Sequence, residues 1–301
     1  GGALTIGAFS LAVTLLMDLS GGNGRNMGVA GLAIGLGAAV GSVIGGVLAD
    51  LHVFYPVYAG AAVLAGGGLL ATTVDDRASN ADVPDSTGSS RAVGLREVLA
   101  RTRTTPGLVV PLAFGFVDRL TAGFFALVGV YYFQDPETFG LSAAGAGATL
   151  ALFFIPFALL QAPLGTLSDR VGRFYPIVVG SLAYGIVTVG VGVAPVYPLA
   201  AGLMVLVGIC GALMAPATMA LVTDLVDPAA RGAAMGLFNV FGSLGFLTGF
   251  LVGGIVTEAF GYTTAFIVVG GLELTIAVAL LPAVKALAPD DGPFRRMSTD
   301  R

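Results

Sequence analysis

GTLSDRVGR, residues 165–173, joins two long apolar runs, 141–164 and 175–194. Each run has about the 20 residues that a helix needs to cross the hydrocarbon core of a bilayer. The polar stretch therefore predicts a tight loop between two transmembrane helices, in which Gly172 permits a sharp turn. Its charged side chains, Asp169, Arg170 and Arg173, are suited to ion pairing or to contact with a helix end.

Apolar runs of similar length recur along the whole chain. With 56% hydrophobic and 11% charged residues, the composition excludes an ordinary water-soluble domain. In hydrocarbon every backbone polar group needs an internal partner, and long runs without strict alternation predict helices rather than barrel strands. We predict an all-α membrane protein, with spans at 3–18, 27–49, 53–73, 108–133, 141–164, 175–194, 198–222, 233–256 and 262–284.

The long polar stretch after the third run divides the chain. It is rich in Ser, Asp and Gly, as a flexible linker is. We predict an amino-terminal group of three helices, residues 1–74, and a cytoplasmic linker, 75–107. A six-helix bundle, 108–285, and a cytoplasmic tail, 286–301, follow.

Basic residues outside the spans fall on one side of the predicted topology. That side holds Arg170, Arg173, Arg231 and Lys285, whereas the opposite loops hold acidic residues and no Lys or Arg. Because cytoplasmic loops carry an excess of basic residues, we expect the linker and the carboxyl terminus to be cytoplasmic in a multi-pass plasma membrane protein.

The first three runs resemble the last three, which indicates an internal repeat. The predicted helices 27–49 and 233–256 share a stripe of glycines. Upstream of each, an acidic residue precedes an arginine by the same interval, Asp18 before Arg25 and Asp224 before Arg231. Glycines at this spacing predict helix-packing faces. The matched pairs are Gly37, Gly41, Gly45 and Gly46 with Gly245, Gly249, Gly253 and Gly254.

The 165–173 motif, G-x-L-x-D-R-x-G-R, resembles a signature of the major facilitator superfamily, carried here by Gly165, Asp169, Arg170, Gly172 and Arg173. The resemblance implies twelve helices in two parallel six-helix halves, of which nine, helices 4–12, are expected in this chain. It also implies that the motif latches the cytoplasmic side. Charges that merely orient the protein in the membrane are the alternative.

The implied partners of this latch lie at the interface between the halves. Asp169 is expected to meet the start of the 27–49 helix near Arg25, and Arg231, Asp18 and Asp224 are further interface candidates. The 37–46 glycine pattern is similar to one in proton-coupled drug exporters, although Ser42 stands where those proteins have proline.

Asp118 and Arg119 lie well inside the predicted span 108–133. An unpaired charge at that depth costs roughly 2.5–3.5 kcal/mol. Three interpretations are open. At least one side chain faces a central cavity, with Asp118 carrying a proton or cation and Arg119 tuning it or anchoring an anionic substrate; both form a static ion pair with another helix; or the span is misplaced.

Other polar residues inside spans carry weaker predictions. Glu273 is central in the last span, but the resemblance places the final helix at the periphery, which favours a structural role. Gln161, Tyr184 and Asn239 are interpreted as packing residues or as part of a cavity lining.

The chemistry of other protein classes is missing from the sequence. It has one histidine, His52, one cysteine, Cys210, and no metal-ligand or nucleotide-binding spacing, so we expect no enzyme, cofactor, metal site or nucleic-acid partner. We predict a monomeric secondary active transporter of a small-molecule substrate in the lipid bilayer, with proton-coupled efflux first. The alternatives are an uptake symporter for a sugar or organic anion, and a non-transporting receptor or scaffold.

Overall fold

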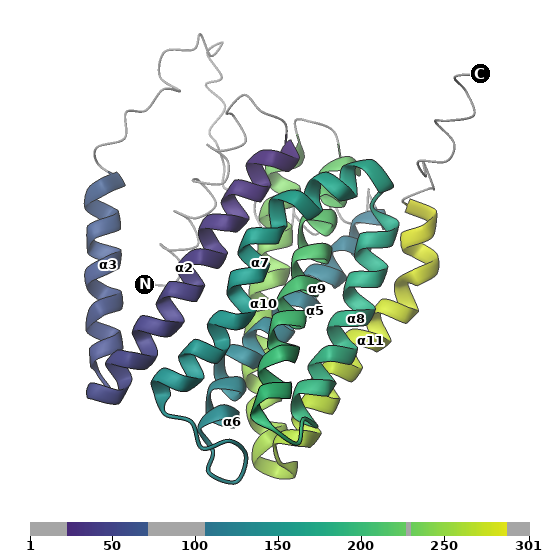
Figure 1. Ribbon diagram of the computed structural model, residues 1–301. Coiled ribbons are helices and arrows are strands. Elements are labelled where there is room, and N and C mark those ends of the chain that lie inside the picture. The colour runs from purple at the N-terminus through teal and green to yellow at the C-terminus, as the bar shows by residue number, and fades with distance from the viewer. Residues whose placement is uncertain (1–22, 72–105, 227–229, 288–301) are drawn as a thin grey trace, which may run out of the picture.

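The computed structural model describes residues 23–71, 106–226 and 230–287, and every element in these ranges is helical (Figure 1). The first two helices are α2 (Asn23–Leu51) and α3 (Tyr55–Ala71). The remaining elements are η2 (Pro106–Leu108), α5 (Val109–Phe124), η3 (Phe125–Gly129), α6 (Val130–Gln134), α7 (Ala143–Val171), α8 (Phe174–Gly192), α9 (Tyr197–Asp224), α10 (Arg231–Phe260) and α11 (Tyr262–Leu287).

The all-α membrane fold is confirmed. Seven helices of the described chain are long and apolar enough to cross a bilayer, and α3 is a shorter apolar helix of 17 residues. Each predicted span from 27–49 onward coincides with one of these helices or with the continuous stretch Pro106–Gln134. The predicted span 3–18, most of the linker and most of the tail lie outside the described residues.

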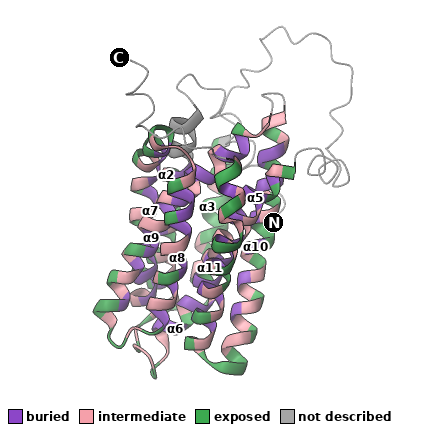
Figure 2. Ribbon diagram, turned by 90° about the vertical axis from the view of Figure 1, so that its right-hand side faces the viewer, coloured by how far each residue is buried: buried purple, intermediate pink, exposed green. Residues whose placement is uncertain are grey.

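Six helical spans, from α5 to α11, form one bundle, and α2 crosses it along α7 (Figure 1). The buried residues line the inner faces of this bundle (Figure 2). Large apolar side chains cover its outside, for example Leu247, Leu251 and Ile255 on α10. Such an apolar exterior suits lipid, since lipid tails are as apolar as these side chains.

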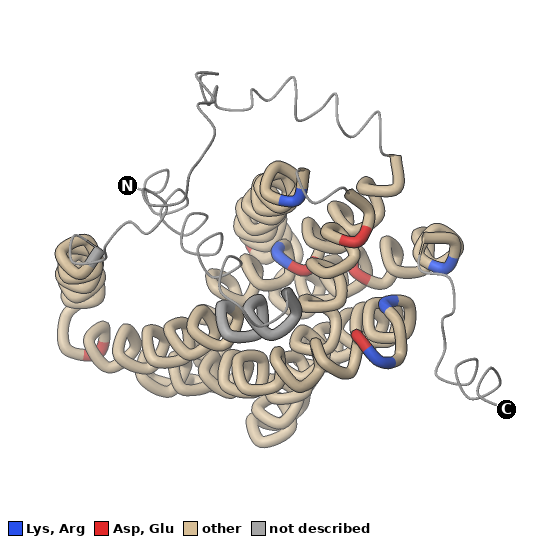
Figure 3. The backbone as a smooth tube through the Cα atoms, turned by 90° about the horizontal axis from the view of Figure 1, so that it is seen from above, with Lys and Arg blue, Asp and Glu red and all other residues tan. Residues whose placement is uncertain are grey.

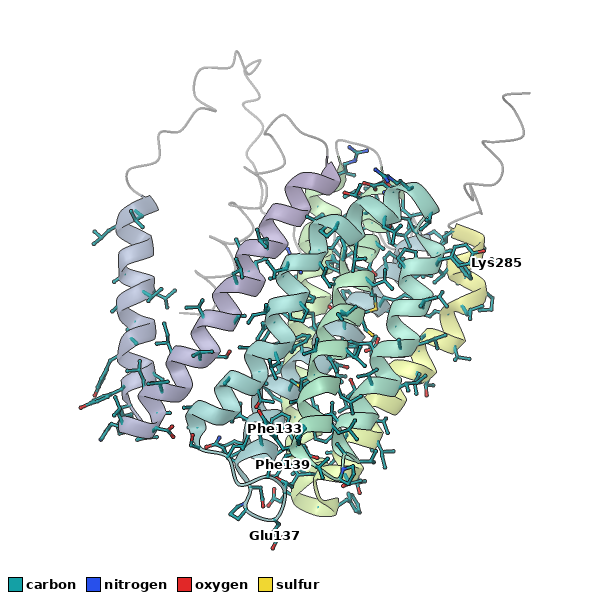
Figure 4. All side chains as sticks on the ribbon, viewed as in Figure 1. Phe133, Glu137, Phe139 and Lys285 are labelled. Carbon is teal, nitrogen blue, oxygen red and sulfur yellow. The ribbon has the colours of Figure 1, made fainter. Side chains whose placement is uncertain are left out.

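The two ends of the bundle carry opposite charge. Lys285 and the loop residue Glu137 lie at opposite ends of the molecule (Figure 4). We call the end with Lys285, Arg170, Arg173 and Arg231 the basic end, and the end with Asp50, Asp135, Glu137 and Glu258 the acidic end. Charged residues are few among the described helices, as the view from above shows (Figure 3).

The prediction of a loop over residues 165–173 is wrong for most of these residues. Helix α7 continues through the motif to Val171, and the turn is confined to Gly172 and Arg173 before α8 begins. Gly172 adopts φ 86°, a left-handed conformation that favours glycine. Asp169 and Arg170 therefore belong to the last turn of a helix.

The span that contains Asp118 is not a uniform helix. Between α5 and α6 the backbone forms the five-residue π-helical segment η3, Phe125–Gly129. Segments of this kind are rare inside helices and occur frequently at functional sites. Nothing in the apolar sequence of η3 distinguishes it from an ordinary helical turn.

Candidate functional site

Asp118 and Arg119 lie near the middle of the Pro106–Gln134 span, and their side chains are 14% and 41% exposed. Arg119 Nε is 3.9 Å from Asp118 Oδ2, a long ion pair that contributes little. The Arg119 side chain lies against α10, since a Cβ at Gly242 would be 3.2 Å from Arg119 Cγ. Asp118 instead lies within electrostatic range of Tyr184 and Glu273.

Glu273, at the middle of α11, is fully buried. Ser181 Oγ on α8 donates a hydrogen bond of 2.6 Å to Glu273 Oε1, and Thr121 Oγ1 on α5 donates one of 3.2 Å to Oε2. The carboxyl group thus joins three helices. The side chain points into the bundle although α11 was expected at its periphery, and the structural role expected for Glu273 stays a prediction.

Two further polar atoms of the predicted candidates are buried without a hydrogen-bond partner in the described chain. They are the Tyr184 hydroxyl and Gln161 Oε1, whose side chains are 0% and 2% exposed. Gln161 lies at the contact with α2, because a Cβ at Gly31 would collide with its amide. Asn239 is half-buried on α10 and its backbone carbonyl accepts a hydrogen bond from Ser243.

The carboxyl-terminal glycine stripe packs α10 against α5. A Cβ at Gly245 would collide with the carbonyl of Phe116, one at Gly249 with the carbonyl of Leu120, and one at Gly253 would lie 2.6 Å from the Phe124 ring. Gly254 has open space beside it among the described residues.

The amino-terminal stripe behaves differently. Gly37, Gly41 and Gly45 have no described atom within 4 Å of an added Cβ, whereas Gly46 lies against the carbonyl of Ala143 on α7. A Cβ at Gly147 would in turn collide with the carbonyl of Ser42. The face of α2 that packs on α7 is therefore offset from most of the predicted stripe.

Asp50, in the last turn of α2, caps the start of α7. Its Oδ1 accepts a hydrogen bond of 2.9 Å from Ala143 N–H and its Oδ2 one of 3.0 Å from Ala144 N–H. Ser142 Oγ accepts a third, from Gly145 N–H. A carboxylate at a helix amino terminus satisfies otherwise free N–H groups and interacts favourably with the helix dipole.

At the basic end, Arg173 links the motif to α9. Its Nε donates to Asp224 Oδ2 at 3.0 Å, and its Nη1 donates to Asp169 Oδ1 at 2.6 Å and to Ser168 Oγ at 3.1 Å. Arg170 is exposed, and buried Gly165 packs near Pro216 of α9. The described partner of Asp169 is thus Arg173 of its own segment, within the six-helix bundle.

The remaining interface candidates are Arg231, Arg25 and Asp18. Arg231 begins α10, and its Nε is buried without a hydrogen-bond partner among the described residues. Arg25 belongs to α2, but its side chain lies outside the description, as does all of Asp18. The described residues contain no group of three or more His, Cys, Asp or Glu side chains that could hold a metal ion.

Comparison with known proteins identifies the family. The model of the Major Facilitator Superfamily matches residues 120–298, more than half of the chain. The multidrug efflux pump LfrA of Mycolicibacterium smegmatis is 28% identical over 166 residues, which cover 54% of this chain and 32% of LfrA. The niacin transporter NiaP of Acinetobacter baylyi is 30% identical over 183 residues, covering 60% of this chain and 40% of NiaP.

Solved structures agree on the fold. A crystal structure of the nucleoside transporter NupG superposes with a TM-score of 0.60 at 18% identity, covering 81% of this chain and 65% of NupG. The peptide transporter POT gives a TM-score of 0.52 at 20% identity, over 64% of this chain and 42% of POT. The chain thus spans about a third to two fifths of the length of LfrA and NiaP.

Proposed function

Because the chain belongs to the Major Facilitator Superfamily, we propose that it works in a secondary active transporter that exports a small solute in exchange for protons. Efflux pumps among its relatives, LfrA and the multidrug resistance efflux pump PmrA of Streptococcus pneumoniae, support this direction. In the proposed mechanism two helical bundles rock about a cavity between them and expose it to one side of the membrane at a time.

Asp118 is the observation that carries the coupling proposal. It is a carboxyl group in mid-span, mostly buried, and its ion pair with Arg119 is too long to hold it firmly. An ionisable residue inside a membrane is costly and marks a functional site by default. A carboxyl group that binds and releases a proton there changes its charge within the bundle, which is what coupling to a proton gradient needs.

The proposed orientation places the basic end in the cytoplasm, following the excess of basic residues in cytoplasmic loops. The Arg173, Asp169 and Asp224 cluster then lies on the cytoplasmic side, and the cap made by Asp50 on the external side. A latch between bundles formed by residues 165–173 stays a prediction, since the described contacts of Asp169 and Arg173 lie within one bundle. The transporter is proposed to be a monomer in the bilayer.

Reconstituted full-length protein tests the coupling. Liposomes with an imposed proton gradient are loaded with a fluorescent drug, and flux is compared between the wild type, Asp118→Asn and the surface control Glu137→Gln. We expect Asp118→Asn to lose gradient-driven flux at least tenfold and the control to retain it. Full coupled flux in Asp118→Asn would contradict the assignment of Asp118.

Uptake of an organic anion is a second candidate, favoured by the exposure of Arg119, which at 41% is greater than that of Asp118. An exposed guanidinium in mid-span is suited to a carboxylate ligand. NiaP, a niacin transporter, is a relative, and niacin carries such a carboxylate. This function would be favoured over export if the wild type accumulates a carboxylate solute and shows no drug efflux, and if Arg119→Gln loses that accumulation.

A further inference from the structure

Glu273 lies in the carboxyl-terminal bundle with no basic partner. Its side chain is fully buried, and no Lys, Arg or His of the described chain forms an ion pair with it. Its two hydrogen-bond partners, Ser181 and Thr121, are neutral hydroxyl groups. The carboxyl group is therefore fixed in position with no ion-pair partner among the described residues.

The energetics favour a neutral carboxyl group at this position. Removing a carboxylate from water costs several kcal/mol even after relaxation. A hydrogen bond to a charged group returns about 1.5–3 kcal/mol, and the Thr121 bond is long. A proton on the carboxyl group removes the cost, and Ser181 Oγ at 2.6 Å is then within reach to accept the hydrogen bond.

Neighbouring titratable groups favour the neutral form further. Asp118 lies one turn before Thr121 on α5, so the two are on the same face of that helix. Tyr184 lies one turn after Ser181 on α8 and likewise shares its face. Thr121 and Ser181 both bond Glu273. Asp118 repels a negative charge on Glu273. The third helix against α11 is α10, whose charged residues stand at its two ends.

The backbone contact beside Glu273 keeps the carboxyl group inside the bundle. Helices α8 and α11 meet through Gly185 and Gly270, where a Cβ at Gly185 would lie 2.8 Å from the Gly270 carbonyl and 3.2 Å from Glu273 Cβ. Next to this crossing, the Tyr184 hydroxyl is buried without a described partner and within electrostatic range of both carboxyl groups. This hydroxyl is therefore a polar group near both carboxyl groups that no described hydrogen bond uses.

We propose that Glu273 is a proton-binding site of the carboxyl-terminal bundle, protonated in the conformation described here, and that it forms with Asp118 a carboxyl pair that keeps at least one proton between α5 and α11. Its part in coupling rests on the proposed proton-driven transport, whereas its protonation does not. In this pair Asp118 is the member nearer to solvent, and Glu273 is the inner one. The Tyr184 hydroxyl is buried within electrostatic range of both carboxyl groups.

Infrared spectroscopy of the full-length protein in liposomes tests the protonation directly, through the carbonyl band of a carboxylic acid at pH 7. We expect a band that shifts when glutamate, but not aspartate, carries a carbon-13 label in its carboxyl group. The band should be lost in Glu273→Gln and kept in Glu258→Gln, the matched change at an exposed helix end. A wild-type spectrum without a glutamate-sensitive band would overturn the proposal, and this reading needs no variant to fold.

Flux measurements on the same samples separate this proposal from the proposed function. A glutamate band lost in Glu273→Gln, together with no gradient-driven flux in the wild type, would support the proton site and contradict proton-coupled transport. Gradient-driven flux without the band would retain coupled transport and overturn the site. With both present, we expect Glu273→Gln to lower gradient-driven flux at least tenfold, while Glu258→Gln leaves it unchanged; full flux in Glu273→Gln would overturn the coupling role of the pair.

Discussion

Asp50 accepts a hydrogen bond of 2.9 Å from the backbone N–H of Ala143, 93 residues later in the chain. Together with the bond from Ala144, this contact ties the acidic end of α2 to the first turn of α7. The repeat places Glu258 of α10 at the position that corresponds to Asp50, and Glu258 is exposed. One copy of the repeat thus carries a cap between helices that the other does not show in the described chain.

Removal of the Asp50 carboxylate should loosen the acidic end. Loss of a helix cap costs about 1 kcal/mol. This is roughly a fivefold shift in the equilibrium between forms in which the end of α2 contacts α7 and forms in which it does not. Spin labels at the exposed positions Leu51 and Phe260, in a Cys210→Ser background, would report a longer distance in Asp50→Ala. Glu258→Ala is the control, and equal distance distributions in both variants would contradict the capping role.

A methyl group at Gly249 should destabilise the bundle, because it would collide with the Leu120 carbonyl and approach the Phe124 amide nitrogen at 2.8 Å. Backbone atoms cannot move aside cheaply, and overpacking costs about 1–3 kcal/mol. We expect a clear fall in the melting temperature of purified Gly249→Ala. Gly254→Ala, with open space among the described residues, should melt as the wild type does; a matching fall there would refute the packing assignment.

Replacement of Arg173 should weaken the basic end. Its guanidinium contacts Asp169 and Asp224, whose side chains are about half exposed, so screening limits the loss to roughly 1 kcal/mol. Arg173→Gln is expected to melt below the wild type at low salt, and the gap should narrow at high salt. The neighbouring Arg170→Gln should have no effect, and a gap that is independent of salt would argue against the ion pairs.

Tyr132 and Tyr131 offer a matched pair at the acidic end. Tyr132 is buried and its hydroxyl donates a hydrogen bond of 3.0 Å to the Val191 carbonyl, whereas Tyr131 is 60% exposed. Tyr132→Phe should lower the free energy of unfolding by about 1 kcal/mol, because it removes a buried hydrogen bond. Tyr131→Phe should lower it less, and the two can be compared by denaturant titration in detergent.

The fold was predictable because a bilayer demands helices of a fixed length. Runs of about 20 apolar residues therefore predicted each described helix. The end of α7 was missed because Ser168, Asp169 and Arg170 are polar, and polarity normally indicates a loop. Here the helix continues into the charged region at the membrane surface, where Arg173 meets both Asp169 and Asp224.

The site was less predictable, since its contacts join residues far apart in sequence. Asp118 was recognisable as a charge inside a span. The partners of Glu273 were not, because Thr121 is 152 residues away and Ser181 is 92, and hydroxyl groups are common in membrane helices. A central carboxyl group on α11 was the available signal, and the expected peripheral place of that helix outweighed it.

The π-helical segment η3 also changes how position along its span should be counted. A π turn holds one residue more than an α turn, so side chains beyond Gly129 are rotated by roughly 100° from where a regular helix would put them. A helical wheel drawn from Val109 to Gln134 would assign Tyr132 to the wrong face. The helical positions of Asp118, before the segment, and of the aromatic residues after it therefore cannot be read from one helical wheel.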